Sequence, residues 1–180
     1  FRNRRSRCGI TFIKIMKIIS GKYKGRVIKM PKNIRPTQNK VRKALFDILG
    51  DIEGLSFLEL FAGSGAVGFE AVSRGVTELA LVEPNSDCLL AIRKNIGAFK
   101  IKACALYPQQ AERALAALHK EGRKFDIIFL DPPYYGDTPK KILQALGGYD
   151  ILNRYGFVVA QHFKKDILPD QAGELTLFRQ

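Results

Sequence analysis

Short apolar runs alternate with amphipathic stretches of helical length between residues 57 and 160. The predicted strands span residues 57–61, 79–82, 101–105, 125–130 and 156–160, and the predicted helices span residues 66–74, 86–98, 109–121 and 139–146. Repeated βα units of this length form a parallel sheet that is covered by helices. The sequence therefore predicts an α/β fold with a doubly wound, mostly parallel sheet. A last strand is expected at residues 174–178, and ligands are expected outside the carboxyl ends of the strands.

A glycine-rich loop joins the first of these strands to the first of these helices. In "FLELFAGSGAVGFEA", Gly63, Gly65 and Gly68 give the spacing G-x-G-x-x-G. Glycines allow a tight turn and close approach of a ligand to the backbone, with a helix N-terminus behind the loop. Glu83 follows the next strand about twenty residues later, where a carboxylate can accept hydrogen bonds from ribose hydroxyls. Together these features predict a cofactor that contains a nucleoside.

The carboxylate of Glu59, on the strand just before the loop, bears on which cofactor this is. NAD fits the glycine spacing, but an acid beside the loop would repel its pyrophosphate. S-adenosylmethionine carries a sulfonium charge and an ammonium group, both of which an acid attracts. We therefore favour S-adenosylmethionine. The candidate cofactor-binding residues are Glu59, Phe61, Ala62, Gly63, Ser64, Gly65, Glu83 and Pro84.

The fourth predicted strand ends in "DPPYYGD", which begins with Asp131. The carboxylate of Asp131 and the carbonyl of Pro132 can each accept one N–H of an exocyclic amine, so that the nitrogen lone pair points at a methyl donor. Pro132 and Pro133 stiffen this segment, and Tyr134 offers a flat face on which an extruded base can stack. Strands one and four flank the switch point of a doubly wound sheet, so Asp131 and the glycine loop should face one crevice.

The net charge of +13 comes entirely from the N-terminal quarter. Residues 1–43 contain fifteen Lys and Arg and no acid, whereas the remainder carries fifteen basic and seventeen acidic residues. Such a segment indicates a polyanionic partner, most simply nucleic acid. We expect a small basic hairpin at residues 17–31. A helix capped by Thr37 should follow, with an apolar stripe formed by Val41, Leu45, Ile48 and Leu49. Residues 1–50 are thus predicted to be a basic nucleic-acid-binding extension and residues 51–180 a methyltransferase domain.

Five segments together resemble the RsmD family of bacterial 16S rRNA guanine-N2 methyltransferases: "KIISGKYKGRVIKMP", "RPTQNKVRKALFDIL", "LELFAGSGAVGFEAVSRG", "LVEPN" and "FDIIFLDPPY". The resemblance implies a Rossmann-like class I methyltransferase fold, S-adenosylmethionine as donor, and N2 of one guanine in 16S rRNA as target, within a 30S particle or an assembly intermediate. It also implies that the basic N-terminal part holds RNA. On this chain that part maps to Lys22, Lys24, Arg26, Arg35, Thr37 and Arg42.

The chain departs from the family pattern at two places. Gln110 stands where related enzymes often have an acid that bonds the adenine amine, and its amide oxygen can still accept that bond. A final antiparallel strand that the family usually has is expected to be absent or truncated. Residues 1–15 are interpreted as an upstream extension before Met16. Three cysteines without ligand spacing predict a cytoplasmic protein with reduced thiols and no metal site, and we expect a monomer that does not enter membranes.

Three alternatives remain at this point. An N6-adenine methyltransferase, acting on DNA or RNA, would use the same Asp-Pro-Pro-Tyr chemistry. An NAD-dependent dehydrogenase explains the glycine spacing but neither Asp131 nor the basic N-terminus. A nucleic-acid-binding protein with an inactive domain would bind RNA without a cofactor.

Overall fold

The computed structural model describes residues 15–31, 38–133, 137–163 and 166–178. Its helices are α1 (Asn39–Leu49), α2 (Ala66–Ser73), α3 (Ser86–Phe99), α4 (Ala111–Lys120) and α5 (Thr138–Leu146). Its strands are β1 (Ser56–Leu60), β2 (Glu78–Val82), β3 (Cys104–Tyr107), β4 (Phe125–Leu130), β5 (Leu152–Ala160), β6 (Gln171–Ala172) and β7 (Leu175–Thr176). The predicted alternation of strands and helices is confirmed, with shifts of a few residues at element ends.

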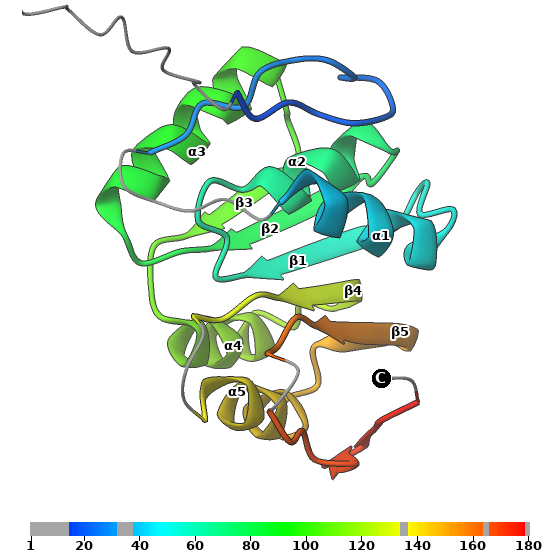
Figure 1. Ribbon diagram of the computed structural model, residues 1–180. Helices are drawn as coiled ribbons and strands as arrows, with labels where there is room; N and C mark the ends of the chain where they lie inside the picture. The colour runs from blue at the N-terminus through cyan, green and yellow to red at the C-terminus, as the bar shows by residue number, and fades with distance from the viewer. Residues whose placement is uncertain (1–14, 32–37, 134–136, 164–165, 179–180) are drawn as a thin grey trace, which may run out of the picture.

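The main sheet has the strand order β3-β2-β1-β4-β5, and every neighbouring pair in it is parallel. In Figure 1, α1, α2 and α3 cover the upper side of this sheet, and α4 and α5 cover the lower side. The predicted doubly wound sheet is therefore confirmed. The order reverses between β1 and β4, which places the switch point where these two central strands end.

The period of two along each strand divides the core into two layers. Phe57 of β1 and Phe129 of β4 pack with α1, α2 and α3, whereas Leu58 of β1 and Ile128 of β4 pack with α4 and α5. β1 is buried along its whole length because helices cover both of its faces. This central strand consequently holds the loop that follows it in a fixed position.

Residues 15–31 form the expected antiparallel pair, with one ladder bridge between Lys17 and Val27. The amide of Ile28 donates to the carbonyl of Met16 at 2.9 Å. Met16, Ile18 and Ile28 are buried in the same core as α1, α2 and α3. The segment is thus packed onto the upper helical layer, although most of its polar side chains face solvent.

The expected strand at residues 174–178 is wrong in extent and placement. Only Leu175–Thr176 are extended, and they pair with Gln171–Ala172 in a separate two-stranded sheet. Among the described residues, β5 is therefore an edge strand of the main sheet, and Tyr155 is 86% exposed there. Within the same described residues, no helix is long and apolar enough to span a membrane.

Candidate active site

The loop after β1 adopts the strained turn that its glycines predict. Phe61, Gly63 and Gly65 have φ values of 59°, 54° and 73°, and Gly65 is the N-cap of α2. A Cβ atom at Gly65 would lie 2.8 Å from the ring of Phe69, so the turn also requires a glycine for packing. A Cβ at Gly63 would meet no atom within 4 Å. Gly63 therefore presents open backbone, where a ligand can approach closely.

Glu83 directly follows β2 and binds the glycine loop. One carboxylate oxygen accepts the amide hydrogen of Gly63 at 2.7 Å, and the other accepts that of Asn85 at 2.8 Å. Asn85 in turn caps α3 by accepting from the amides of Asp87 and Cys88. Each carboxylate oxygen has a second lone pair, so Glu83 can still accept hydrogen bonds from a ligand hydroxyl. The acid thus fixes the loop and remains able to bind a ribose.

Glu59 lies beneath the loop, where its side chain is 3% exposed. Its Oε2 atom accepts the amide hydrogen of Gly68 in the first turn of α2 at 2.8 Å. The pKa of Glu59 is raised to about 8, chiefly by burial and also by the nearby charge of Asp131, while the bond from Gly68 and the charge of Arg42 oppose the shift. A cationic ligand above the loop would favour the ionised form of this carboxyl. Direct contact with a cofactor ammonium group stays a prediction.

Asp131 reaches the same edge of the sheet as the loop. Leu60 pairs with Leu130 in the register of β1 and β4, so the residues that follow them, Phe61 and Asp131, leave the sheet side by side. The electrostatic effect of Asp131 on Glu59 agrees with this placement. Asp131 is half-buried, Pro132 is buried and Pro133 is exposed. The predicted shared edge is confirmed, whereas Tyr134 lies outside the described residues.

The other predicted cofactor residues occupy the same edge. Ala62 and Ser64 are buried within the loop, where the amide of Ala62 donates to the carbonyl of Val82 at 2.9 Å. Pro84 is exposed after β2. Gln110 is exposed as the N-cap of α4, and its side chain makes no capping hydrogen bond. Its amide is therefore available to a ligand that lies beyond β3.

The residues predicted to bind RNA fall into three groups. Lys22, Lys24 and Arg26 are exposed on the hairpin, as an RNA contact requires. The guanidinium of Arg26 lies over the rings of Tyr23 and Phe99, at 5.6 and 5.2 Å from their centroids. Arg35 and Thr37 lie outside the described residues. The third group is Arg42 alone.

The structure corrects the prediction for Arg42, whose side chain is 0% exposed. Its Nη2 atom donates to the carbonyl of Lys17 at 2.6 Å and to Asn39 Oδ1 at 2.9 Å, and its Nη1 atom donates to the carbonyl of Ala66 at 3.2 Å. Nη1 also lies 3.9 Å from the buried carboxylate of Glu70. Burial lowers the pKa of Arg42, and the charge of Glu70 acts in the opposite direction. A guanidinium enclosed in this way cannot reach an RNA phosphate, so Arg42 leaves the RNA-binding set.

Sequence reasoning missed the polar side chains that fix the hairpin. Glu70 of α2 accepts from the amides of Ile19 and Ser20 at 2.7 and 2.9 Å. Ser73 Oγ accepts from the amide of Tyr23 at 2.9 Å, and Asn95 Oδ1 accepts from that of Lys29 at 2.8 Å. A carboxylate within the apolar helix "AVGFEAVS" was the one available signal, because a buried acid needs partners.

Comparison with known proteins gives a consistent result. A family model described as conserved hypothetical protein 95 matches residues 16–180. A Bacillus subtilis protein named putative rRNA methyltransferase YlbH is 37% identical over 169 residues, which cover 92% of each chain. The Escherichia coli protein named ribosomal RNA small subunit methyltransferase D is 34% identical, over 92% of this chain and 83% of that protein.

Solved structures share the fold. A hypothetical protein of Thermus thermophilus superposes with a TM-score of 0.76 at 33% identity, covering 85% of this chain and 89% of that one. A more distant structure, titled a putative methyltransferase complexed with SAH, has a TM-score of 0.61 at 19% identity and covers 72% of this chain and 36% of its own. The predicted class I methyltransferase fold is thus confirmed.

Proposed function

Because this chain belongs to the RsmD family, we propose that it methylates the exocyclic N2 amine of one guanine in 16S ribosomal RNA. The chain is an S-adenosylmethionine-dependent rRNA methyltransferase. The choice of N2 of guanine rests on the family resemblance. The substrate is proposed to be the RNA within a 30S particle, and the enzyme is proposed to act as a monomer.

The residues at the carboxyl edge of the sheet fit the cofactor. S-adenosylmethionine, when bound, supplies an electrophilic methyl group on a sulfonium. The open backbone at Gly63 would lie against it, and Glu83 would accept hydrogen bonds from its ribose. Glu59 would hold the first turn of α2 in place and add negative potential beneath the loop. Gln110 would accept from the adenine amine.

The proposal that the enzyme positions the reacting amine depends on Asp131. The register of β1 and β4 brings its carboxylate to the edge that holds the glycine loop. There Asp131 and the Pro132 carbonyl would each accept one N–H of the guanine amine, which turns the nitrogen lone pair toward the methyl carbon. The carbon–sulfur bond breaks as the nitrogen–carbon bond forms, and the alkylated nitrogen then loses a proton toward Asp131 and solvent. Positioning and electrostatics supply most of the rate, because no strong base is required.

Substitution of Asp131 tests this role. Asp131→Ala should lower kcat by at least about 100-fold, the order expected when one preorganised polar partner is removed from a transition state. Its dissociation constant for S-adenosylmethionine, measured by calorimetry, should stay within a few-fold of the wild-type value. Asp150→Asn, which removes an exposed acid at the opposite edge of the sheet, is the matched control and should leave kcat unchanged. Turnover by Asp131→Ala at the wild-type rate would remove the catalytic role.

The base is tested separately. Labelled methyl groups are transferred to 30S particles that lack the modification, and the product nucleotide is located by digestion and mass spectrometry. Label on N2 of guanine supports the proposal. Label on N6 of adenine would replace it with the alternative activity, while a protein that binds NAD and not S-adenosylmethionine would exclude both.

A further inference from the structure

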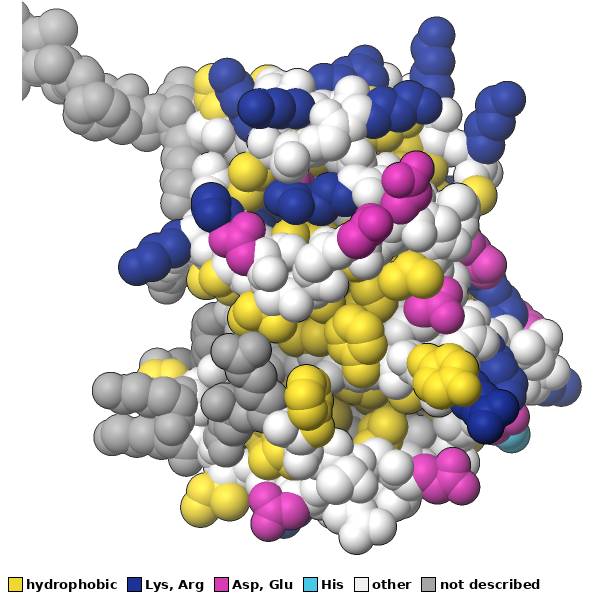
Figure 2. All heavy atoms as spheres, turned by 90° about the vertical axis from the view of Figure 1, so that its right-hand side faces the viewer, with side chains coloured by type: hydrophobic (Ala, Val, Ile, Leu, Met, Phe, Trp, Pro, Cys, Tyr) yellow, Lys and Arg dark blue, Asp and Glu magenta, His cyan; other side chains and the backbone are white. Residues whose placement is uncertain are grey.

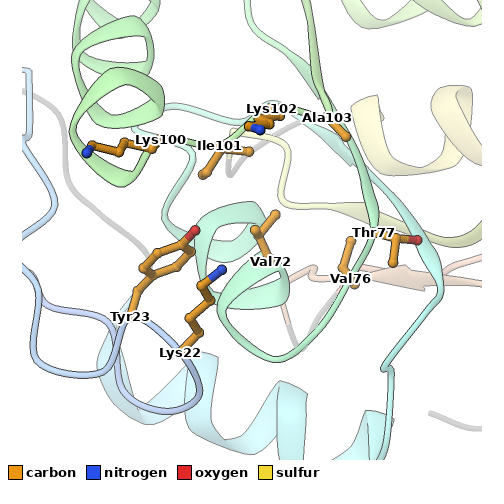
Figure 3. A pocket seen from close by; sticks show the side chains of 9 residues that line it. All are labelled: Lys22, Tyr23, Val72, Val76, Thr77, Lys100, Ile101, Lys102 and Ala103. Carbon is orange, nitrogen blue, oxygen red and sulfur yellow. The ribbon is translucent and has the colours of Figure 1, made fainter.

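A hollow of about 300 Å³ lies at the edge of the sheet opposite the glycine loop (Figure 3). Thr77 and Ala103, which immediately precede β2 and β3, form part of its wall. Lys22 and Tyr23 of the hairpin and Val72 of α2 form other parts. The hollow therefore lies at the amino ends of β2 and β3, whereas Glu83 and Asp131 follow carboxyl ends of strands.

Three lysines line this hollow, and none of its lining residues is acidic. Lys22 comes from the hairpin, while Lys100 and Lys102 come from the turn between α3 and β3. In Figure 3 the ammonium end of Lys22 and the hydroxyl end of Tyr23 point into this space, whereas the side chain of Lys100 extends away from it. Within the described residues, none of the three makes an ion pair with a carboxylate. Three uncompensated positive charges around one hollow favour an anionic ligand.

Part of the wall of the hollow is apolar, and its hairpin side is held in place. Val72, Val76 and Ile101 provide aliphatic surface, and the ring of Tyr23 stacks on Phe99 with centroids 5.4 Å apart. The hairpin approaches α2 so closely that a Cβ atom at Gly21 would lie 1.7 Å from the carbonyl oxygen of Ser73. The amide of Lys22 donates to that oxygen at 2.7 Å. The hollow is therefore preformed, which lowers the entropic cost of binding.

The surrounding surface has the same sign of charge. Figure 2 views the molecule from the side on which the strands begin, and it shows Lys and Arg side chains gathered over its upper part. Residues 15–31 lie there and contain five basic and no acidic residues. Acidic side chains lie between and below these basic side chains, and apolar side chains are more frequent over the lower part of this face. The hollow thus lies on the side of the molecule where the basic hairpin is exposed.

We propose that this hollow binds a sugar–phosphate unit of the substrate RNA at a point remote from the methylated base. The inference rests on the proposed function for the identity of the nucleic acid. The ammonium groups of Lys22, Lys100 and Lys102 suit a phosphate, and the aliphatic wall beside Tyr23 suits a ribose or base. A strand of five residues spans roughly 16 Å, so the RNA must extend at least that far from the target nucleotide. The contact anchors and orients the RNA and takes no part in methyl transfer.

Lys100 and Lys102 give the sharpest test, because both lie outside the basic N-terminal segment. Lys100→Gln/Lys102→Gln is compared with Lys120→Gln/Lys124→Gln, which removes two charges at the end of α4 and just before β4, on the other face of the sheet. The first variant should bind 16S rRNA on the order of tenfold more weakly. The slope of log affinity against log salt should fall by about 1 for each phosphate that the variant no longer neutralises. The second variant should match the wild type in both measurements.

Kinetics separate this inference from the proposed function. At saturating RNA, the Lys100→Gln/Lys102→Gln variant should keep the wild-type kcat with a raised KM, and its affinity for S-adenosylmethionine should be unchanged. Wild-type RNA affinity and salt dependence in this variant would overturn the inference while leaving the methyltransferase assignment intact. Equal losses of RNA affinity in both double variants would also overturn the inference, because they would indicate a general effect of net charge. Failure of the wild type to methylate any rRNA would instead overturn the proposed function.

A protein partner is the competing explanation for a basic hollow. Weakened binding to 30S particles with unchanged binding to protein-free 16S rRNA would show that an acidic protein surface occupies it, and would overturn the inference. Amine acetylation provides a direct readout: bound RNA should protect Lys100 and Lys102 while Lys120 stays reactive. Lack of protection at Lys100 and Lys102 would exclude RNA from the hollow.

Discussion

Replacement of Arg42 by methionine should destabilise the fold and leave the affinity for RNA nearly unchanged. The guanidinium is fully buried and bonds the hairpin at Lys17, the first residue of α2 at Ala66, and Asn39. Methionine fills much of the space but removes the fully buried positive neighbour of Glu70, which keeps only the partly exposed Arg74, 3.0 Å from its other carboxylate oxygen, as an ion-pair partner among the described residues. Removal of one partner of a buried ion pair costs about 3–5 kcal/mol. For a chain of this size, we expect Tm to fall by roughly 6–20 °C.

Urea unfolding followed by circular dichroism measures the free energy of unfolding, and a filter or polarisation assay measures RNA affinity below the transition. Lys43→Met is the matched control on the same helix. Its side chain is 66% exposed, with Asp47 as an i,i+4 partner, so the change should stay within about 0.5 kcal/mol. The two variants lose the same charge from neighbouring positions, so the difference between them reports burial.

A double-mutant cycle measures how much the interaction of Arg42 with Glu70 contributes to the free energy of unfolding. Arg42→Met/Glu70→Gln should recover part of the loss, because glutamine removes the buried charge that Arg74 alone would then balance and keeps an oxygen for the amides of Ile19 or Ser20. If Arg42→Met keeps the wild-type stability to within about 1 kcal/mol and shows weaker, less salt-dependent RNA binding, then the buried arrangement is wrong and Arg42 contacts RNA after all.

The remaining predictions concern Glu59, which lies beneath the glycine loop, and Gly65, which lies within it. Glu59 has a pKa raised from 4.5 to about 8, so its folded form binds more protons than its unfolded form between these values and loses stability as the pH rises through about 8. Between pH 4.5 and 8.5 the wild type should lose up to about 5 kcal/mol of its free energy of unfolding through Glu59, at 1.36 kcal/mol for each pKa unit. Glu59→Gln should abolish this loss. Parallel curves of unfolding free energy against pH for the wild type and the variant would contradict the prediction. Gly65→Ala should cost roughly 2–4 kcal/mol, because φ is 73° and the new Cβ would lie 2.8 Å from Phe69. Gly97→Ala, at an open position in α3, should instead stabilise by about 0.5–1 kcal/mol, and similar unfolding midpoints for the two alanine variants would refute the strain at Gly65.

The sheet and its functional edge could be predicted because their signals are local and their geometry is forced. Buried strands such as Phe125–Leu130 are continuous apolar runs, and parallel connections place every strand end on the same side. Asp131 and Glu83 each follow a strand directly, so the topology alone brings them near the glycine loop. The positions of Asp131 and Glu83 at this edge are therefore predictable without any knowledge of side-chain contacts.

The packing of α1 was predicted only in part: Leu45 is buried and Leu49 packs against the core, but Ile48 does not. The sequence favoured a stripe of Val41, Leu45, Ile48 and Leu49, but Ile48 is 65% exposed and the buried residues are Arg42, Leu45 and Phe46. Arg42 occupies the i position relative to Leu45 and Phe46 at i+3 and i+4, which is a core position by spacing. From the sequence alone, a charged residue at such a position is predicted to face solvent unless its partner is known. That partner, Glu70, lies on another helix, and only the tertiary structure brings the two together.

Glu70 also relates the surface that we propose to bind RNA to the glycine loop. α2 begins at the glycine loop, and its buried Glu70 and Ser73 hold the amides of the hairpin that presents Lys22, Lys24 and Arg26. Arg42 adds a bond from α1 to the first residue of α2. One helix therefore serves as the common support for both surfaces, and neither can shift without moving the other. Because the supports are preformed, binding energy from the proposed RNA contacts would be available to orient the amine that we propose to lie at Asp131, and would not be needed to order the protein.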